Sequence, residues 1–173
     1  EGDGSNKVFI MRAQRNLGAP ILCACARVSF GSCLCGRAAL FRKVVFRDNI
    51  DDAHDISYLG MLPHGHYCVP ILALDGDILG VINLYVKPGY IRNKQEEDFL
   101  QAVAGILAGV IERRRTEICR VESEAKFRAI FESSRDAIML LGINGFMDCN
   151  QATLVLFGYE SRNDFLSKHP AEL

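Results

Sequence analysis

The stretch HYCVPILALDGDILGVINLYV, residues 66–86, decides the fold of this chain. Two apolar runs, 66–74 and 78–86, flank Asp75-Gly76-Asp77, and apolar runs on either side of an Asp-Gly turn predict a β-hairpin. Pro70 has no amide hydrogen to donate to a neighbouring strand, so we expect an edge or a bulge in the first strand at that point.

A long helical pattern follows the hairpin, from about Asn93 to Ser133, with no proline inside it. Farther along this helix, Ile111, Ile118, Val121 and Ala125 lie 7, 3 and 4 residues apart, which is coiled-coil periodicity. We expect them to form a signalling helix that pairs with a second copy of the chain, with a solvated linker helix as the alternative. The first part of the helix carries an apolar stripe typical of a core helix: Phe99, Val103, Ile106, Leu107, Val110 and Ile111.

The segment before the hairpin alternates short elements with turns. We expect a turn over residues 1–6, a strand over 7–17, a short helix over 37–42 and a strand that begins at Val44. Residues 48–65 are polar and turn-rich, which predicts a long loop.

The last part of the chain changes character again. Residues 136–143 and 146–149 predict two short strands around an Asn-Gly turn. Asn150 is a favourable N-cap for a helix that ends at about residue 157, and a further helical turn follows at 161–166.

The composition is that of an ordinary globular protein: of 173 residues, 49% are hydrophobic and 24% are charged, and the formal net charge is -1. This balance gives no electrostatic footprint for nucleic acid. No run is long and apolar enough to span a bilayer, and no signal peptide is visible. Seven cysteines without a secretion signal predict a cytoplasmic chain whose thiols are reduced, metal-bound or redox-active. The chain does not begin with methionine, and we expect it to be a piece of a longer protein.

The stretch VPILALDGDILGVINLYV, followed by the helix EEDFLQAVAGILAGVIERRR, resembles the GAF family over residues 7–115. The resemblance implies an α/β (α+β) fold, with a central antiparallel sheet flanked by helices. The opening helix and the first strand of such a domain are not found in this sequence. The implied organisation is a GAF-like sensor domain over 1–115, a linker helix over 116–126 and the N-terminal part of a second domain over 127–173.

That second part resembles the beginning of a PAS domain, in EAKFRAIFESSRDAI, residues 124–138, and DCNQATLVLFGYESRNDFLSKHP, residues 148–170. Together with the segments LCGRAA and PHGHYCVPI, the order GAF–PAS resembles the input regions of bacterial sensor histidine kinases. The resemblance implies a sensory module with a downstream output domain in cis, either a kinase or a cyclic-dinucleotide enzyme. It implies no catalytic role for this stretch of chain itself.

Cysteines and histidines gather at Cys33 and Cys35 and again at His64, His66 and Cys68. In an extended chain, residues two apart point the same way, so each group can direct its side chains at one atom. Thiolate and imidazole suit zinc, iron or copper, which makes Cys33, Cys35, His64 and His66 candidate ligands of a metal or an iron-bearing cofactor. The candidates for sensing a small ligand or a redox state are Cys33, Cys35, His64, His66, Tyr67 and Cys68.

A structural role is the alternative for these side chains. Unligated cysteines are often buried, and we expect Cys23 and Cys25 to pack in the core. In this interpretation His66 and Tyr67 anchor a loop by hydrogen bonds. His54 is expected in a surface loop, outside any array of catalytic bases.

An enzyme is a further alternative. The loop Cys33-Leu34-Cys35-Gly36 resembles the GxCG loop of the free methionine-R-sulfoxide reductases, which are GAF proteins. This likeness implies Cys35 as a nucleophile just before a helix, whose dipole lowers a thiol pKa, with Cys33 or Cys68 as the resolving partner. A GAF domain with an empty pocket, serving only as a dimerisation spacer, is the third alternative.

Overall fold

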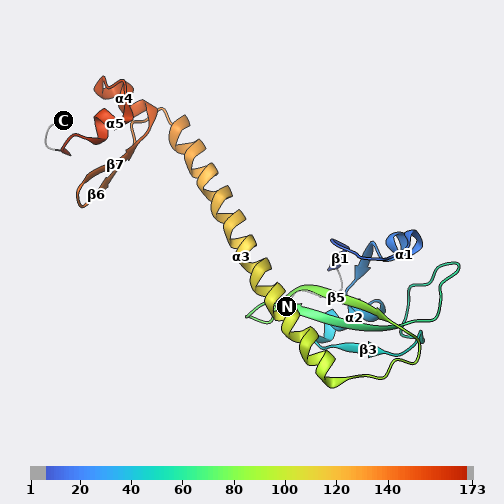
Figure 1. Ribbon diagram of the computed structural model, residues 1–173. Helices are drawn as coiled ribbons and strands as arrows, with labels where there is room; N and C mark the ends of the chain where they lie inside the picture. Colours follow the sequence, from blue (N-terminus) through green and yellow to red (C-terminus); the bar gives the residue numbers. More distant parts are fainter. Residues whose placement is uncertain (1–6, 171–173) are drawn as a thin grey trace. The chain divides into compact units, whose positions relative to one another are not determined.

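The computed structural model describes residues 7–170 and contains two compact units, one that ends at Arg114 and one that begins at Arg115 (Figure 1). Both units combine helices with antiparallel strands, in agreement with the fold class predicted from the sequence. The turn expected over residues 1–6 lies outside the described residues.

A three-stranded antiparallel sheet forms the centre of the first unit, in the order β3 (Val45–Arg47), β4 (Gly65–Leu72) and β5 (Ile78–Val86). The predicted hairpin is confirmed, because β4 and β5 pair along their whole length. β3 pairs with residues 66–68 only, so among the described residues Pro70 has no strand beside it on that side. The missing amide hydrogen of Pro70 therefore breaks no ladder bond to β3.

Helix α2 begins earlier than the sequence predicted. The helix expected over 37–42 starts at Cys33, and the strand expected over 7–17 ends at Ile10. Gly36 lies in the added first turn, where a Cβ atom would lie 2.2 Å from the backbone oxygen of Ser29. Only glycine lets the helix lie directly on the preceding strand. The remaining elements of the first unit are β1 (Val8–Ile10), α1 (Ala19–Ala24), β2 (Arg27–Ser29), α2 (Cys33–Phe41) and the first part of α3 (Lys94–Ser133).

Side chains of β4 alternate between two layers, because successive residues of a strand point to opposite faces. Tyr67, Val69 and Ile71 belong to the main core cluster, which they form with α3. Cys68 faces the other way and belongs to a second cluster with α2. Strand β4 therefore lies between the two helices, and it is buried from Gly65 to Ile71.

The helix predicted over 93–133 is confirmed as α3, but the face that it buries differs from the prediction. Ala104 and Ala108 contact the sheet, whereas Phe99, Ile106 and Val110 are 67%, 69% and 58% exposed. The prediction of a core role was therefore wrong for these three large side chains and for Leu107, which is 38% exposed. The alanines let α3 lie close to the bulky residues of β4. No helix among the described residues is long and apolar enough to cross a membrane.

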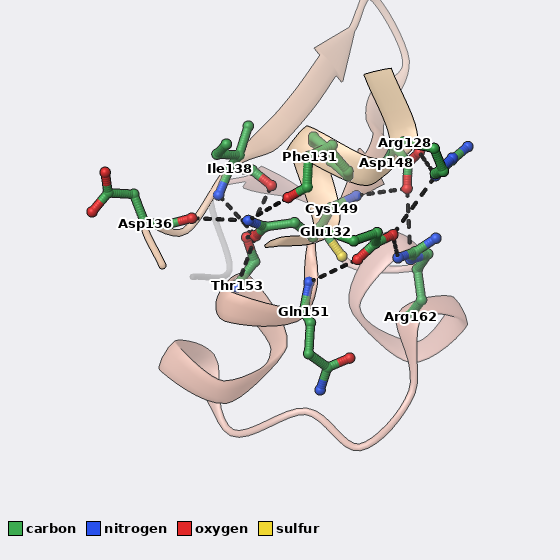
Figure 2. Close-up of polar contacts among 11 residues, drawn as sticks. Arg128, Phe131, Glu132, Asp136, Ile138, Asp148, Cys149, Gln151, Thr153 and Arg162 are labelled. Atoms are coloured by element: carbon green, nitrogen blue, oxygen red, sulfur yellow. Dashed lines mark hydrogen bonds and ion pairs between the residues drawn. The ribbon is translucent and has the colours of Figure 1, made fainter. Parts of the chain in front are cut away.

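In the second unit, two strands and two helices follow the last part of α3. Asn150 is the N-cap of α4, as the sequence predicted, and its Oδ1 accepts a hydrogen bond from the Thr153 amide at 3.0 Å. The Nδ2 atom of Asn150 donates to the carbonyl oxygens of Phe131 and Asp136, while Oδ1 also accepts from the Ile138 amide. Figure 2 shows Phe131, Asp136, Ile138 and Thr153 gathered around this network of hydrogen bonds. Asn150 thus ties the end of α3 to the small sheet. The elements are β6 (Met139–Gly142), β7 (Gly145–Cys149), α4 (Gln151–Phe157) and α5 (Arg162–Leu166).

Candidate functional site

Several elements bring cysteines and histidines together on the α2 side of the central sheet. His66 and Cys68 come from β4, and Cys35 comes from the first turn of α2. His54 and His64 come from the loop that precedes β4. The structure thus gathers four of the six sensing candidates, and it adds His54, which the sequence had placed outside any array.

Cys35 and Cys68 face each other with 3.7 Å between their Sγ atoms. Cys68 is fully buried, whereas Cys35 is partly exposed. The pKa of Cys35 is lowered, because the thiol of Cys68 donates a hydrogen bond to it. The same hydrogen bond, together with burial, raises the pKa of Cys68. Cys35 is therefore the thiol of the pair that ionises more readily, and Cys68 is its hydrogen-bond donor.

Cys33 has a different environment from Cys35. It begins α2 with a backbone φ of 52°, and its amide donates a hydrogen bond to the carboxylate of Asp55. Asp55 also forms an ion pair with Arg37 at 3.1 Å. Burial raises the pKa of Cys33. Because Cys33 and Cys35 both belong to a helix, they do not have the extended-chain geometry that we expected to direct them at one atom.

The other cysteines lie outside the thiol pair. Cys23 is exposed and Cys25 is half-buried, and α1 buries none of its residues, so the core packing expected of Cys23 was wrong. Cys119 is exposed on α3, and Cys149 is buried in the second unit.

Three imidazole rings, those of His54, His64 and His66, lie with their centroids between 4.6 and 5.4 Å apart. The Nε2 atoms of His54 and His66 are 3.1 Å apart, and His66 Nδ1 donates to Asn83 Oδ1 at 3.0 Å. Burial lowers the pKa of His66 to about 4 and also lowers that of His54, so both rings are neutral at pH 7. Asn83 Oδ1 also lies 3.5 Å from Cys68 Sγ, which joins the histidines to the thiol pair.

Tyr67 points to the opposite face of β4. Its hydroxyl accepts a hydrogen bond from the backbone amide of Asn93 at 2.9 Å. Asn93 in turn caps the start of α3, since its Oδ1 accepts the amide of Gln95 at 2.9 Å. Tyr67 therefore anchors a loop by a hydrogen bond, and it links the strand that carries His66 and Cys68 to the first turn of α3.

The residues proposed for the signalling helix divide into two groups. Ile111 packs against the core of the first unit, whereas Ile118, Val121 and Ala125 are exposed on α3. The exposed three belong to none of the core clusters of the described residues.

Known proteins match both parts of the chain. The family model of the GAF domain matches residues 2–112, and that of the PAS domain matches residues 125–172. A methyl sulfide methyltransferase-associated sensor from Methanosarcina acetivorans is 28% identical over 106 residues, which are 60% of this chain and 10% of that protein. A solved structure of a GAF domain is 26% identical to this chain, with a TM-score of 0.44. The match covers 50% of this chain and 49% of the chain in that structure. The chain thus spans about a tenth of the length of the curated relative that it matches.

Proposed function

Because the chain belongs to the GAF domain family and a PAS domain match follows, we propose that it is the sensory input region of a signal-transduction protein that reads a redox state at Cys35 and Cys68. The relative named above is a sensor, which supports the assignment. A sensor histidine kinase is the parent protein that we propose, with the kinase, or a cyclic-dinucleotide enzyme, as the output domain in cis. We propose a cytoplasmic location, where thiols are kept reduced until an oxidant appears.

The observation that carries this proposal is that Cys68, one member of the thiol pair, lies on a strand that also contacts the long helix. Cys68 reaches Cys35 from one face of β4, and Tyr67 and Val69 pack toward α3 from the other face. A buried strand is packed too tightly to absorb a displacement on one face alone. A displacement of Cys68 on oxidation would therefore also alter the packing of β4 against α3.

Helix α3 supplies the relay, since it continues without a break from Lys94 to Ser133. Its far end is fixed to the second unit, because Asn150 holds the Phe131 carbonyl and Arg128 pairs with Asp148 at 2.8 Å. A shift or rotation of the helix would reach the PAS part through these contacts. We propose that two copies of the chain pair along the helix, because a switch of this kind needs two packed arrangements of a helix pair. The residues of that seam are Ile111, Ile118, Val121 and Ala125.

A hydroperoxide is the class of oxidant that the pair would read. The Cys35 thiolate attacks the terminal peroxide oxygen, an S–O bond forms, the O–O bond breaks and an alkoxide leaves, or hydroxide in the case of hydrogen peroxide. Cys68 then attacks the sulfenic sulfur, an S–S bond forms, and the lost oxygen leaves as water with the proton of Cys68. With hydrogen peroxide the balance is two thiols oxidised to one disulfide and one peroxide reduced to two waters.

Hydrogen exchange tests the relay. A reference variant carrying Cys23→Ser and Cys119→Ser removes two exposed thiols that would cross-link molecules. Treatment of this variant with hydrogen peroxide should change the exchange rates of α3 amides around Ala104 and Ala108 and beyond residue 115. The additional change Cys68→Ser should abolish the response. A disulfide that forms while α3 exchanges at unchanged rates would contradict the relay and favour the spacer alternative.

The adjacency of Cys35 and Cys68 also favours a second function, the reduction of free methionine sulfoxide. Cys35 has the lowered pKa of a nucleophile, and Cys68 lies at the distance of a resolving thiol. Incubation with free methionine-R-sulfoxide, thioredoxin and its reductase decides this alternative. Turnover that disappears in Cys35→Ser would assign an enzyme, and no turnover above that of Cys35→Ser would remove it.

A further inference from the structure

We propose that His54, His64 and His66 form a binding site for one divalent transition-metal ion of the Zn²⁺ class. The chain has four histidines, and these three converge with donor atoms that lie within 4.8 Å of one another. Neither Cys33 nor Cys35 belongs to this group. The proposal adds a metal input to the sensory region and does not depend on the redox chemistry of the thiols.

The distances suit a small metal ion. Two nitrogen ligands that bind Zn²⁺ at 2.0–2.1 Å with tetrahedral angles lie about 3.3 Å apart. The Nε2 atoms of His54 and His66 are already 3.1 Å apart. His64 is the third ligand, and its ring meets that of His66 edge-on with 4.6 Å between centroids. The donor atom of His64 lies within 4.8 Å of those of the other two rings, so the His64 side chain moves toward them to complete the site.

The hydrogen bonds leave the correct nitrogen atoms available. His64 Nδ1 lies 2.6 Å from the carbonyl oxygen of Leu62, and His66 Nδ1 lies 3.0 Å from the amide oxygen of Asn83. Both oxygens are acceptors, so both Nδ1 atoms carry the hydrogen and both Nε2 atoms present a lone pair. The lone pair of His66 Nε2 accepts a hydrogen bond from His54 Nε2 at 3.1 Å, and a metal ion that binds both nitrogen atoms takes the place of that hydrogen. His64 Nε2 is buried and has no hydrogen-bond partner among the described residues. A buried lone pair without a partner is costly in a protein and is the group that a metal ion satisfies.

The surroundings match those of metal-binding histidines. Such residues generally donate their second ring nitrogen to a carbonyl or carboxylate oxygen, as Leu62 and Asn83 provide here. Imidazole suits zinc, copper and nickel, and three protein ligands leave a fourth position for water or a signal molecule. Among the described residues no carboxylate or thiol joins the group, so we favour a borderline ion over Mg²⁺ or Ca²⁺.

The backbone holds the three rings in place. Gly65, between His64 and His66, approaches β3 so closely that a Cβ atom would lie 2.4 Å from the Arg47 carbonyl oxygen. On the other side, the amide of His54 donates to the Asp51 carbonyl at 2.9 Å. Backbone contacts therefore position both segments that carry the ligands.

Titration of the reduced chain with Zn²⁺ in competition with a chelating dye tests the proposal, and Co²⁺ serves as a spectroscopic probe of the same site. We expect one equivalent to bind and tetrahedral Co²⁺ to give its visible absorption band. His54→Ala and His66→Ala should each weaken Zn²⁺ binding by more than about 100-fold, since loss of an outer partner alone costs 10–100-fold. His169→Ala is the matched control, and it should bind like the original chain.

The thiols are tested in the same experiment. Cys35→Ser should bind Zn²⁺ with unchanged affinity if the histidines are the ligands. Binding that survives in His54→Ala but disappears in Cys35→Ser would overturn the proposal and assign the metal to the thiols. If the original chain binds Zn²⁺ no more strongly than His54→Ala does, the proposal is also overturned. Oxidation of Cys35 and Cys68 by peroxide is a separate result and does not depend on this outcome. Circular dichroism of each variant establishes that it is folded.

Discussion

Oxidation of the Cys35–Cys68 pair should raise the free energy of unfolding of the GAF unit by about 3–4 kcal/mol, the magnitude expected for a disulfide that closes a loop of this length. The two thiols are 33 positions apart in the sequence. A cross-link over that separation removes loop-closure entropy from the unfolded chain. Their sulfur atoms must approach from 3.7 Å to about 2.05 Å, and the cost of this movement lowers the measured gain.

The assay is urea unfolding of the Cys23→Ser, Cys119→Ser reference variant in its oxidised and reduced forms. The chain has no tryptophan, and four of its five tyrosines lie in the GAF unit, so tyrosine fluorescence follows that unit. Peptide mapping identifies the bond, and a reductant should restore the original curve. The Cys68→Ser variant is the control, and peroxide should leave its midpoint unchanged. A mapped Cys35–Cys68 bond with no gain in stability would show that the two sulfur atoms are not held as the structure places them.

The remaining predictions concern two glycines, a cap residue and a thiol. Gly36→Ala should destabilise the GAF unit by about 3 kcal/mol, because the added methyl group would overlap the Ser29 carbonyl oxygen. Gly105→Ala, in open space on α3, should stabilise the unit by about 0.5–1 kcal/mol. Urea unfolding measures both changes, and equal effects would contradict the close packing at Gly36. Asn150→Ala should lower the free energy of unfolding of the PAS part by about 3 kcal/mol, because the helix loses its cap and two carbonyl groups lose their hydrogen-bond donor. Thermal unfolding measures this loss, and Gln151→Ala, at an exposed position, is the neutral control. The rate of alkylation of Cys35 should reach half its maximum at a pH below 9.0. Cys68→Ala should move that pH midpoint upward, because the S–H donor that stabilises the Cys35 thiolate is lost. A midpoint that does not move would contradict this explanation of the lowered pKa.

The hairpin, the long helix and the N-cap at Asn150 could be predicted because each depends on local sequence. An Asp-Gly turn between apolar runs and an uninterrupted helical period have few alternative structures. The start of α2 could not be predicted in this way. The sequence placed the helix after Gly36, over 37–42, whereas Gly36 lies inside α2 and closely approaches the Ser29 carbonyl, which only the packed structure reveals.

The buried face of α3 was missed for a different physical reason. Hydrophobic periodicity favours the largest apolar residues as the core face, and here Phe99 and Ile106 point away from the sheet. The sheet already presents bulky side chains such as Tyr67 on this face, so the complementary helix face is the one with Ala104 and Ala108. Sequence alone lists the apolar residues of one helix but does not give the shape of the opposing surface.

His54 was missed because no local pattern connects it to His66. Its position couples the two proposed inputs, which are oxidation of the thiol pair and binding of Zn²⁺ by the histidines. Its neighbour Asp55 holds the first amide of α2 and pairs with Arg37 on the same helix. β4 is paired on both sides at Cys68, so α2 must move together with β4 when the sulfur atoms approach each other. That movement pulls Asp55, and with it the loop that carries His54. Disulfide formation should therefore change the affinity for Zn²⁺. Because coupling between two sites is reciprocal, bound Zn²⁺ should change the equilibrium for oxidation of the thiols by the same factor.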